Sequence, residues 1–472
     1  MTNVPESIFP TKHSRVEGGW KPATLVRQLG IVSATAIVIS NMVGTGIFTT
    51  TGFLAGDLGD PRLVLGIWVA GALIALAGAF CYSELGINFP SSGGEYVYLT
   101  RAFGPTWGFM TGWVSFFAGF SAPIAAAALA FSDYLGYFNP ALKQSNAAIA
   151  LGSGAFSLKL GGAQAAASGL IVLLTLVNCL GVQRVAKMQN LLTGAKLIVI
   201  SSFIVLAFHG GRGDWANFSL HAARTSNTPI AAQFAISMFW IFVCYSGWNA
   251  ATYVAEELKR PERTLPVALM FGTALVAALY LALNVVFIYA IPLEQMKGVV
   301  AIGSLAALHL FGPQTAGAFS GLMALSLVAT VNAMVTIGPR VYYAMAKNGA
   351  FFRTAAQVHP RWRTPVAAIL CQGACAVLLT ITPFRSLIEY IGFSLTFFAV
   401  MSVASLFIFR RRAGWQKLRV VSFAFPLIPL AFILAGLWTI AYGIMLEPKV
   451  SIAAVLTIAL GAAVYRFRSR RD

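Results

Sequence analysis

The chain contains 472 residues, of which 58% are hydrophobic and only 10% are charged. Because soluble proteins carry about a quarter charged residues, a soluble fold could not bury this much apolar surface, and the composition predicts an all-α membrane protein. The formal net charge of +18 indicates nucleic-acid binding only if the basic residues lie together on one surface, so their positions must be considered first.

Apolar runs of about 20 residues predict twelve membrane-spanning helices. These runs lie near residues 31–56, 63–87, 101–135, 164–181, 189–208, 230–255, 266–291, 317–345, 365–381, 386–409, 421–446 and 449–465. The polar gaps between the runs are interpreted as loops, and none suggests a separate soluble domain.

Basic residues are unevenly distributed between the two predicted sides of the membrane. If the N-terminal tail lies inside and the spans alternate, 24 of the 33 basic residues lie inside, eight lie outside and one, Lys196, lies within a span. This bias follows the positive-inside rule, so we expect a multi-pass protein of the inner or plasma membrane with both termini in the cytoplasm. A nucleic-acid partner is then not expected. Residues 1–30 show no pattern typical of a removable signal peptide.

The sequence shows no motif for catalysis or metal binding. It has no Walker-type nucleotide loop and no histidine-rich constellation, so we expect no catalytic residues, no cofactor and no metal site. All cysteines fall within or at the ends of apolar runs, and structural disulfides are therefore not expected. These cysteines are Cys81, Cys179, Cys244, Cys371 and Cys375.

The first predicted span is interrupted near its centre by the sequence NMVGTGIF, residues 41–48. Gly44, Thr45 and Gly46 are poor helix formers, although the surrounding run from Ile31 to Leu54 contains no charged residue. Breaking a helix here costs backbone hydrogen bonds that lipid cannot replace. Either the break exposes backbone groups for a purpose, or the glycines serve close helix packing.

The sixth span has a second interruption, YSGWN at residues 245–249. Two broken spans, five apart, are typical of transporters built from inverted repeats, in which unwound backbone near the midplane binds the substrate. This pattern predicts a cytoplasmic tail, two five-helix repeats, two added helices and a second cytoplasmic tail. The corresponding residues are 1–30, 31–210, 230–412, 421–465 and 466–472.

Three stretches resemble the amino acid–polyamine–organocation (APC) superfamily, and within it bacterial members of the L-type amino acid transporter (LAT) group. They read CYSELGINFPSSGGEYVYLTRAFGP (81–105), YSGWNAATYVAEELKRPERTLP (245–266) and GPRVYYAMAKNG (338–349). The resemblance covers essentially the whole chain in the order and number of spans. It implies a leucine-transporter-like fold that moves amino acids by alternating access, commonly without sodium.

The two breaks are chemically suited to a zwitterion. An unwound helix frees N–H groups at the start of the following half-helix and C=O groups at the end of the preceding one. We expect the amides of Thr45, Gly46 and Ile47 to hold the α-carboxylate, with Gly44 and Gly46 allowing close approach to the backbone. Carbonyl groups near Met42, Val43, Val243, Cys244 and Ser246 would accept hydrogen bonds from the α-ammonium.

The resemblance also implies side chains for the pocket. By family position, Ser246, Trp248 and Asn249 would line it, with Asn332 on the eighth span as a further candidate. For Trp248, packing against lipid or core is the alternative. No Asp or Glu lies deep in a predicted span, so a cationic substrate would lack a counter-ion and neutral amino acids are favoured.

Two gates are also suggested. Many relatives have an aromatic outer gate two residues before the motif tyrosine, where this chain has Val243, so Phe242 or Trp240 would have to substitute. At the inner side, charged residues follow the sixth span and are either a solvated surface or a latch formed with Glu95 and Arg340. They are Glu256, Glu257, Lys259, Arg260, Glu262 and Arg263.

Lys196 is the one strongly basic residue within an apolar run. In LAT relatives a lysine at the matching fifth-span position occupies the place that sodium fills in other transporters of this fold. The resemblance therefore implies that Lys196 replaces sodium or acts as a proton-linked group, whereas the alternative is that it snorkels to the cytoplasmic face.

These observations predict a sodium-independent exchanger or facilitator of neutral L-amino acids. Proton-coupled uptake of cationic or broad-range amino acids is the alternative, and a membrane sensor or lipid-modifying enzyme is the competitor from another class. The expected partners are the amino acid and the lipid bilayer. Eukaryotic relatives are tethered to a glycoprotein through an external cysteine between spans 3 and 4, and residues 136–163 contain none. We therefore expect a monomer without a disulfide-linked heavy chain.

Overall fold

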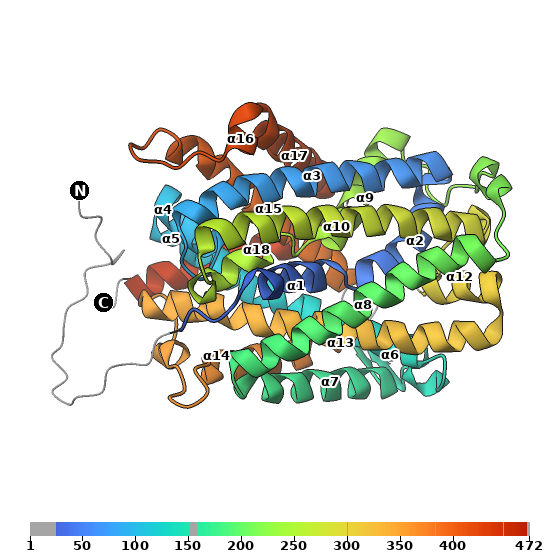
Figure 1. The fold of residues 1–472 in the computed structure, drawn as a ribbon, viewed down its shortest axis with the longest axis horizontal. Coiled ribbons are helices and arrows are strands. Elements are labelled where there is room, and N and C mark those ends of the chain that lie inside the picture. Colours follow the sequence, from blue (N-terminus) through green and yellow to red (C-terminus); the bar gives the residue numbers. More distant parts are fainter. Residues whose placement is uncertain (1–24, 152–157, 300, 383, 447, 470–472) are drawn as a thin grey trace.

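The computed structural model describes residues 25–151, 158–299, 301–382, 384–446 and 448–469. In these residues the chain is a helical bundle whose long helices run along its longest axis (Figure 1). The helices of the first half are α1 (Ile31–Met42), α2 (Thr45–Leu58), α3 (Pro61–Asn88), α4 (Glu95–Phe103), α5 (Pro105–Val114), the π-helix η1 (Ser115–Ser121), α6 (Ala122–Leu135), the short 3-10 helices η2 (Pro140–Leu142) and η3 (Gln144–Asn146), α7 (Gly162–Cys179) and α8 (Val182–Gly210).

The second half continues with further helices and only short connections. They are η5 (Trp215–Ser219), α9 (Ile230–Tyr245), the 3-10 helix η6 (Ala250–Glu257), α10 (Pro261–Ala290), α11 (Leu293–Met296), α12 (Ile302–Phe311), α13 (Pro313–Lys347), η7 (Arg353–Ala356), α14 (Val366–Leu379), α15 (Phe384–Phe409), α16 (Arg419–Phe423), α17 (Leu427–Leu446) and α18 (Pro448–Ser469). Among the described residues, strands occur only in a small antiparallel hairpin between α6 and α7. Its strands are β1 (Ile149–Leu151) and β2 (Leu158–Leu160).

Ten segments of the described chain are long and apolar enough to cross a membrane, and they correspond to ten of the twelve expected spans. The other two expected spans, 365–381 and 449–465, correspond to α14, which has 14 residues, and to α18, which has 22. A 14-residue helix such as α14 is about 21 Å long at 1.5 Å per residue, which is less than the roughly 30 Å of a hydrocarbon core. α12 is a separate apolar helix directly before α13, and runs of about 20 apolar residues do not predict it because it has only ten residues.

The two interrupted regions have non-helical backbone. α1 ends at Met42 and α2 begins at Thr45, and the two follow one another along the bundle (Figure 1). α9 ends at Tyr245, and η6 begins only at Ala250. Between them Gly247 has φ +98°, which favours glycine, and a Cβ there would lie 2.7 Å from the backbone of Asn41. The segment after α9 is therefore pressed against the end of α1.

These two regions lie in the packed interior of the bundle. α10 packs against both α3 and α1, and α13 packs against α6 and α8. α2 packs against α9, so each interrupted helix contacts the other. This arrangement brings the backbone of both interruptions to one place, although they are about 200 residues apart in the chain.

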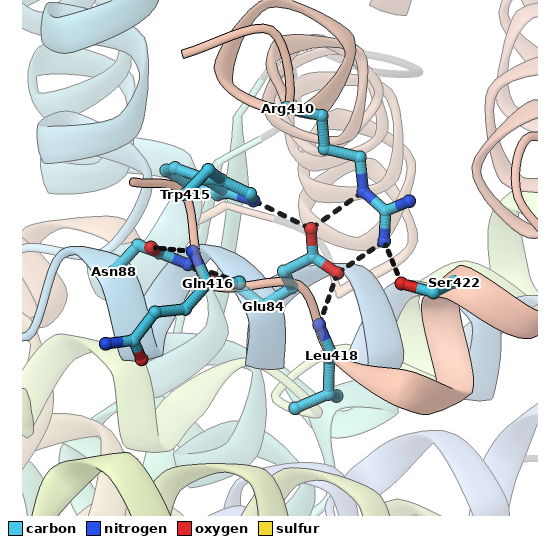
Figure 2. Close-up of polar contacts among 7 residues, drawn as sticks. All are labelled: Glu84, Asn88, Arg410, Trp415, Gln416, Leu418 and Ser422. Carbon is cyan, nitrogen blue, oxygen red and sulfur yellow. Dashed lines mark hydrogen bonds and ion pairs between the residues drawn. The ribbon is translucent and has the colours of Figure 1, made fainter. Parts of the chain in front are cut away.

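One end of the bundle is fastened by Glu84, a fully buried residue near the end of α3 (Figure 2). Arg410 donates to both carboxylate oxygens, at 2.7 and 2.6 Å. The indole N–H of Trp415 and the backbone N–H of Leu418 complete the set at 2.8 and 3.0 Å. Asn88 exchanges two further hydrogen bonds with the backbone of Gln416. The segment between α15 and α16 is thus held against α3 by a carboxylate whose charge is compensated.

Candidate functional site

A cavity of about 90 Å³ lies beside the interruption between α9 and η6. Its wall includes residues of α1, α3, α4, η1, α6, α13, α15 and α17 as well as of α9 and η6. The π-helix η1 contributes Gly119 and Phe120, and π-helical turns are frequent at functional sites. The cavity is therefore formed where many helices converge around an irregular backbone segment.

Five of the pocket and outer-gate residues expected from the sequence line this cavity, all from the segment around the second interruption. They are Phe242, Val243, Ser246, Trp248 and Asn249. Trp248 packs edge-on against Tyr82, with ring centroids 4.6 Å apart, and against Phe432 at 5.9 Å. These contacts exclude the lipid-facing alternative for Trp248, which is only 7% exposed.

The first interruption is adjacent but does not contribute its predicted residues to the cavity wall. Asn41 lines the cavity, whereas none of the six residues from Met42 to Ile47 does. Instead the carbonyl groups at the end of α1 accept hydrogen bonds from side chains. Tyr280 of α10 donates to the carbonyl oxygen of Met42 and, at 3.1 Å, to that of Cys244. Sequence analysis missed Tyr280, because one tyrosine in an apolar span carries no signal of its role.

The side chain of Lys196, a residue of α8, reaches the end of α1. Its Nζ donates to the carbonyl oxygen of Val43 at 2.6 Å and to Oγ1 of Thr330 at 2.8 Å. The Thr330 hydroxyl itself donates to the same Val43 oxygen at 2.8 Å. Lys196 is only 2% exposed, so the snorkelling alternative is wrong. α1, α8 and α13 are thereby joined at one backbone carbonyl.

The start of α2 combines unpaired amides with tight packing. Thr45, Gly46 and Ile47 are the first three residues of α2, and their N–H groups have no preceding helical turn to accept them. A Cβ at Gly46 would lie 2.5 Å from Sγ of Cys244 and 2.8 Å from its Cα. A Cβ at Gly44 would lie 3.3 Å from Thr330. Gly46 therefore serves the close contact between α2 and α9.

Asn332 lies outside the cavity wall, in a buried polar cluster between α7, α8 and α13. It donates to Gln189 at 2.6 Å and accepts from Asn178 at 2.8 Å. Asn178 in turn accepts from Thr336. These groups hydrogen-bond to one another between three helices, and Asn332 does not line the cavity.

The two aromatic gate candidates lie on different sides of α9. Phe242 lines the cavity, whereas Trp240 stacks on Phe53 of α2 with ring centroids 5.0 Å apart. Trp240 also lines a second cavity, of about 230 Å³, whose lining residues include Asp57 and Glu389. Trp240 thus extends from α9 to α2 and also borders the second cavity.

Among the charged residues that follow α9, Glu257 forms a buried ion pair with Arg340. Nε of Arg340 lies 2.8 Å from Oε1 of Glu257, and both side chains are 1% exposed. The backbone oxygen of Glu257 accepts from the N–H groups of Gln28 and Leu29, each at 2.9 Å. Lys347, by contrast, is solvent-exposed and 4.0 Å from Glu256. The pair of Glu257 and Arg340 therefore ties η6, α13 and the segment before α1 together.

Glu95, the first residue of α4, also reaches the cavity. Its Oε1 accepts from the hydroxyl of Tyr82 at 2.6 Å and from Nδ2 of Asn249 at 3.1 Å. Burial raises the pKa of Glu95 from 4.5 to about 7, although these hydrogen bonds oppose the shift. Sequence analysis treated Glu95 only as a latch candidate, since its position in the connection between two spans gave no sign that it would face a cavity.

Comparisons with known proteins agree with this architecture. The amino acid permease family matches residues 29–462. The mouse Asc-type amino acid transporter 1 is 28% identical over 451 residues, covering 93% of this chain and 81% of the relative. The human large neutral amino acids transporter small subunit 2 is 28% identical over 455 residues, covering 93% and 80%. The serine/threonine exchanger SteT of Bacillus subtilis (strain 168) is 29% identical over 455 residues, covering 95% and 98%.

The match extends through both interrupted regions and nearly all of the described helices. The similar proteins are transporters rather than enzymes, and the ten long apolar segments agree with a protein that spans a membrane several times. The chain belongs to the amino acid permease family of the amino acid–polyamine–organocation superfamily.

Proposed function

We propose that the chain is a sodium-independent secondary transporter, an exchanger or a facilitator, of neutral L-amino acids. It would work by alternating access. Its twelve spans would form a leucine-transporter-like 5+5 inverted repeat in which helices 1 and 6 are broken. Both termini would lie in the cytoplasm. The cavity at the interruption after α9 is the observation that carries this proposal. The names of the similar proteins support it, since they include transporters of large neutral amino acids and of serine and threonine.

The substrate would bind between the two interruptions. The N–H groups of Thr45, Gly46 and Ile47 at the start of α2 are a favourable site for the α-carboxylate. Since the carbonyl groups of Met42, Val43 and Cys244 already accept hydrogen bonds, the ammonium would be held mainly by carbonyls of the segment after α9, near Ser246. Its side chain would lie against Trp248 and Asn249.

Sodium independence rests on Lys196. Sodium would need oxygen ligands at the junction of the first, fifth and eighth spans, and there the ammonium of Lys196 already contacts Val43 O and Thr330 Oγ1. A second cation would meet this positive charge at close range in a medium of low dielectric constant. Phe242 and Trp240 would close the outer side, and Glu257 with Arg340 the inner side.

Reconstitution of the single polypeptide tests the proposal. Purified protein in proteoliposomes should take up radiolabelled L-serine, L-threonine or L-leucine when sodium is replaced by choline. Uptake that needs amino acid inside the vesicle identifies an exchanger, and uptake without it identifies a facilitator. Strict sodium dependence, or uptake only in the presence of a second polypeptide, would contradict the proposal. A serine/threonine preference would associate the chain with SteT in function as well as in sequence.

A second candidate is proton-coupled uptake of cationic or broad-range amino acids. One observation favours it, because the carboxylate of Glu95 lines the cavity. A pH gradient imposed across the same vesicles separates the two candidates: a coupled transporter concentrates its substrate in response to the gradient, whereas a facilitator or strict exchanger does not.

A further inference from the structure

We infer that Glu95 is a proton-binding site of the transport cycle, and that protonation of its carboxylate sets how the cavity binds substrate. This inference rests on the proposed transport of amino acids and names a residue through which pH acts on it. The proton would come from a hydronium ion on the side to which the cavity is open: one O–H bond of hydronium would break, one would form on the carboxylate, and water would be left.

The first argument is the absence of a compensating cation. Among the described residues, no lysine or arginine pairs with Glu95, which is only 4% exposed. Its hydrogen-bond partners are the neutral side chains of Tyr82, Asn249 and Tyr253. An ionised carboxylate in such a place is costly, and the usual outcome is that it binds a proton.

Glu84 provides the comparison within the same chain. It is also buried, but it accepts two hydrogen bonds from Arg410 and two more from Trp415 and Leu418 (Figure 2). Its charge is compensated, so its role is to fasten a segment. Glu95 is about as buried as Glu84, but no arginine donates to its carboxylate. A proton can therefore bind to Glu95 without breaking an ion pair.

The surroundings of Glu95 are consistent with titration near neutral pH. The titratable groups that face it are the phenols of Tyr82 on α3, Tyr98 on α4 and Tyr253 on η6, while Arg340 on α13 is already paired. Burial raises the pKa of Glu95 to about 7, and its position at the N-terminus of α4 opposes a larger shift, since the helix dipole favours the anion.

The link from Glu95 to the substrate cavity is Asn249. One side-chain amide group of Asn249 donates both to Glu95 Oε1, at 3.1 Å, and to the hydroxyl of Tyr253, at 3.0 Å. Asn249 and Glu95 both line the cavity. A proton on Glu95 turns an acceptor into a donor, so it changes which hydrogen bonds remain for Asn249 and for a substrate.

Glu95 is also in a position to influence the inner gate. A Cβ at Gly94, directly before it, would lie 2.8 Å from Thr252 and from the ring of Tyr253, so the start of α4 is pressed against η6. η6 ends at Glu257, which pairs with Arg340. A change of charge at Glu95 therefore acts on the same short helix that carries the gate.

The first test needs no substrate. Infrared difference spectra of the purified full-length protein between about pH 5 and about pH 9 should show a protonated carboxyl band that titrates near neutral pH and is lost in Glu95→Gln. Glu294→Gln is the matched control, since Glu294 lies on the short helix α11, is 57% exposed, pairs with Lys297 and does not line the cavity. Tyr82→Phe removes a donor to the carboxylate, so it should move the midpoint to higher pH. A neutral-range band that persists in Glu95→Gln would overturn the inference.

The second test uses transport of L-serine in proteoliposomes. A carboxyl that titrates near pH 7 changes its ionised fraction about tenfold between about pH 6 and about pH 8, so the KM of the wild type should differ several-fold between these values. Glu95→Gln should have one KM at both values, whereas Glu95→Asp and Glu294→Gln should retain the difference. Wild-type pH dependence in Glu95→Gln would refute the role. If the wild type transports no amino acid, the proposed function fails while the infrared titration still decides whether Glu95 binds a proton.

Discussion

The ammonium of Lys196 lies 2.6 Å from the carbonyl oxygen of Val43, at the point where α1 ends. Thr330 reaches the same oxygen from α13. A carbonyl at the end of a helix carries a partial negative charge, and a buried lysine beside it satisfies both groups. Three helices of the bundle are thus connected through one backbone atom.

Lys196→Ala should therefore impair transport more than folding. Hydrogen bonds to charged groups contribute about 1.5–3 kcal/mol, so substrate affinity or turnover should fall by about tenfold to about a hundredfold. Transport with sodium replaced by choline, together with the thermal unfolding temperature in detergent, measures both effects. Lys187→Ala is the matched control, because Lys187 lies on the same helix and is exposed. Normal transport kinetics in Lys196→Ala would remove Lys196 from the mechanism.

Gly46→Leu should abolish substrate binding while membrane insertion remains intact, since leucine favours insertion. The structure adds that Gly46→Ala should already be harmful, because its Cβ would lie 2.8 Å from Cα of Cys244. Overpacking of this kind costs about 1–3 kcal/mol.

Gly66→Ala on α3 is the control for Gly46→Ala, because a Cβ at Gly66 meets no atom within 4 Å. It should be tolerated or should stabilise the helix by up to about 1 kcal/mol. Binding of radiolabelled L-serine and thermal unfolding of the purified variants give the measurements. Unchanged affinity and stability in Gly46→Ala would show that α2 and α9 can separate at this point.

The pair of Arg340 and Glu257 should be strongly coupled. Removal of one partner, in Arg340→Met or Glu257→Gln, leaves the other buried without compensation and should cost about 3–5 kcal/mol of stability. Replacing both residues should cost less than the sum of the single changes. A double-mutant cycle on thermal stability measures this coupling. The pair of the exposed Lys347 and the partly exposed Glu256, 4.0 Å apart, is the control and should give less than about 1 kcal/mol. If the effects of the two single changes on stability simply add, the ion pair of Arg340 and Glu257 does not stabilise the protein as expected.

Glu95 should make stability depend on pH. With its pKa at about 7 in the folded protein and 4.5 ordinarily, the folded state holds an extra proton between these values. The stability contribution is complete below about pH 4.5 and falls by about 1.4 kcal/mol per pH unit as pH rises towards 7. The unfolding temperature of the wild type should therefore fall relative to that of Glu95→Gln over this range. Parallel curves for the two proteins would place the pKa of Glu95 at its ordinary value.

The sequence predicts the helical membrane fold well, because a long apolar run must be a helix in lipid and ten such runs are helices here. Trp248 and Asn249, which the family resemblance implies, line the cavity, and Lys196, a charged residue within an apolar run, is buried. The sequence does not reveal Glu95 or Tyr280, because each reaches its partners only after distant helices have packed. Glycine is ambiguous for the same reason: Gly46 in the sequence indicates close approach, and only the packing identifies Cys244 as the neighbour.

The anchor at Glu84 imposes an order on the assembly of the protein. Arg410 follows Glu84 by 326 residues, so at synthesis rates of about 5–20 residues per second it emerges roughly 20 to 60 seconds later. Throughout this interval the carboxylate of Glu84 lacks its arginine and needs other polar partners such as water, since an uncompensated charge in apolar surroundings is costly. We therefore expect the end of α3 to reach its final position only when the polypeptide is nearly complete, so that this contact forms late in the biogenesis of the protein.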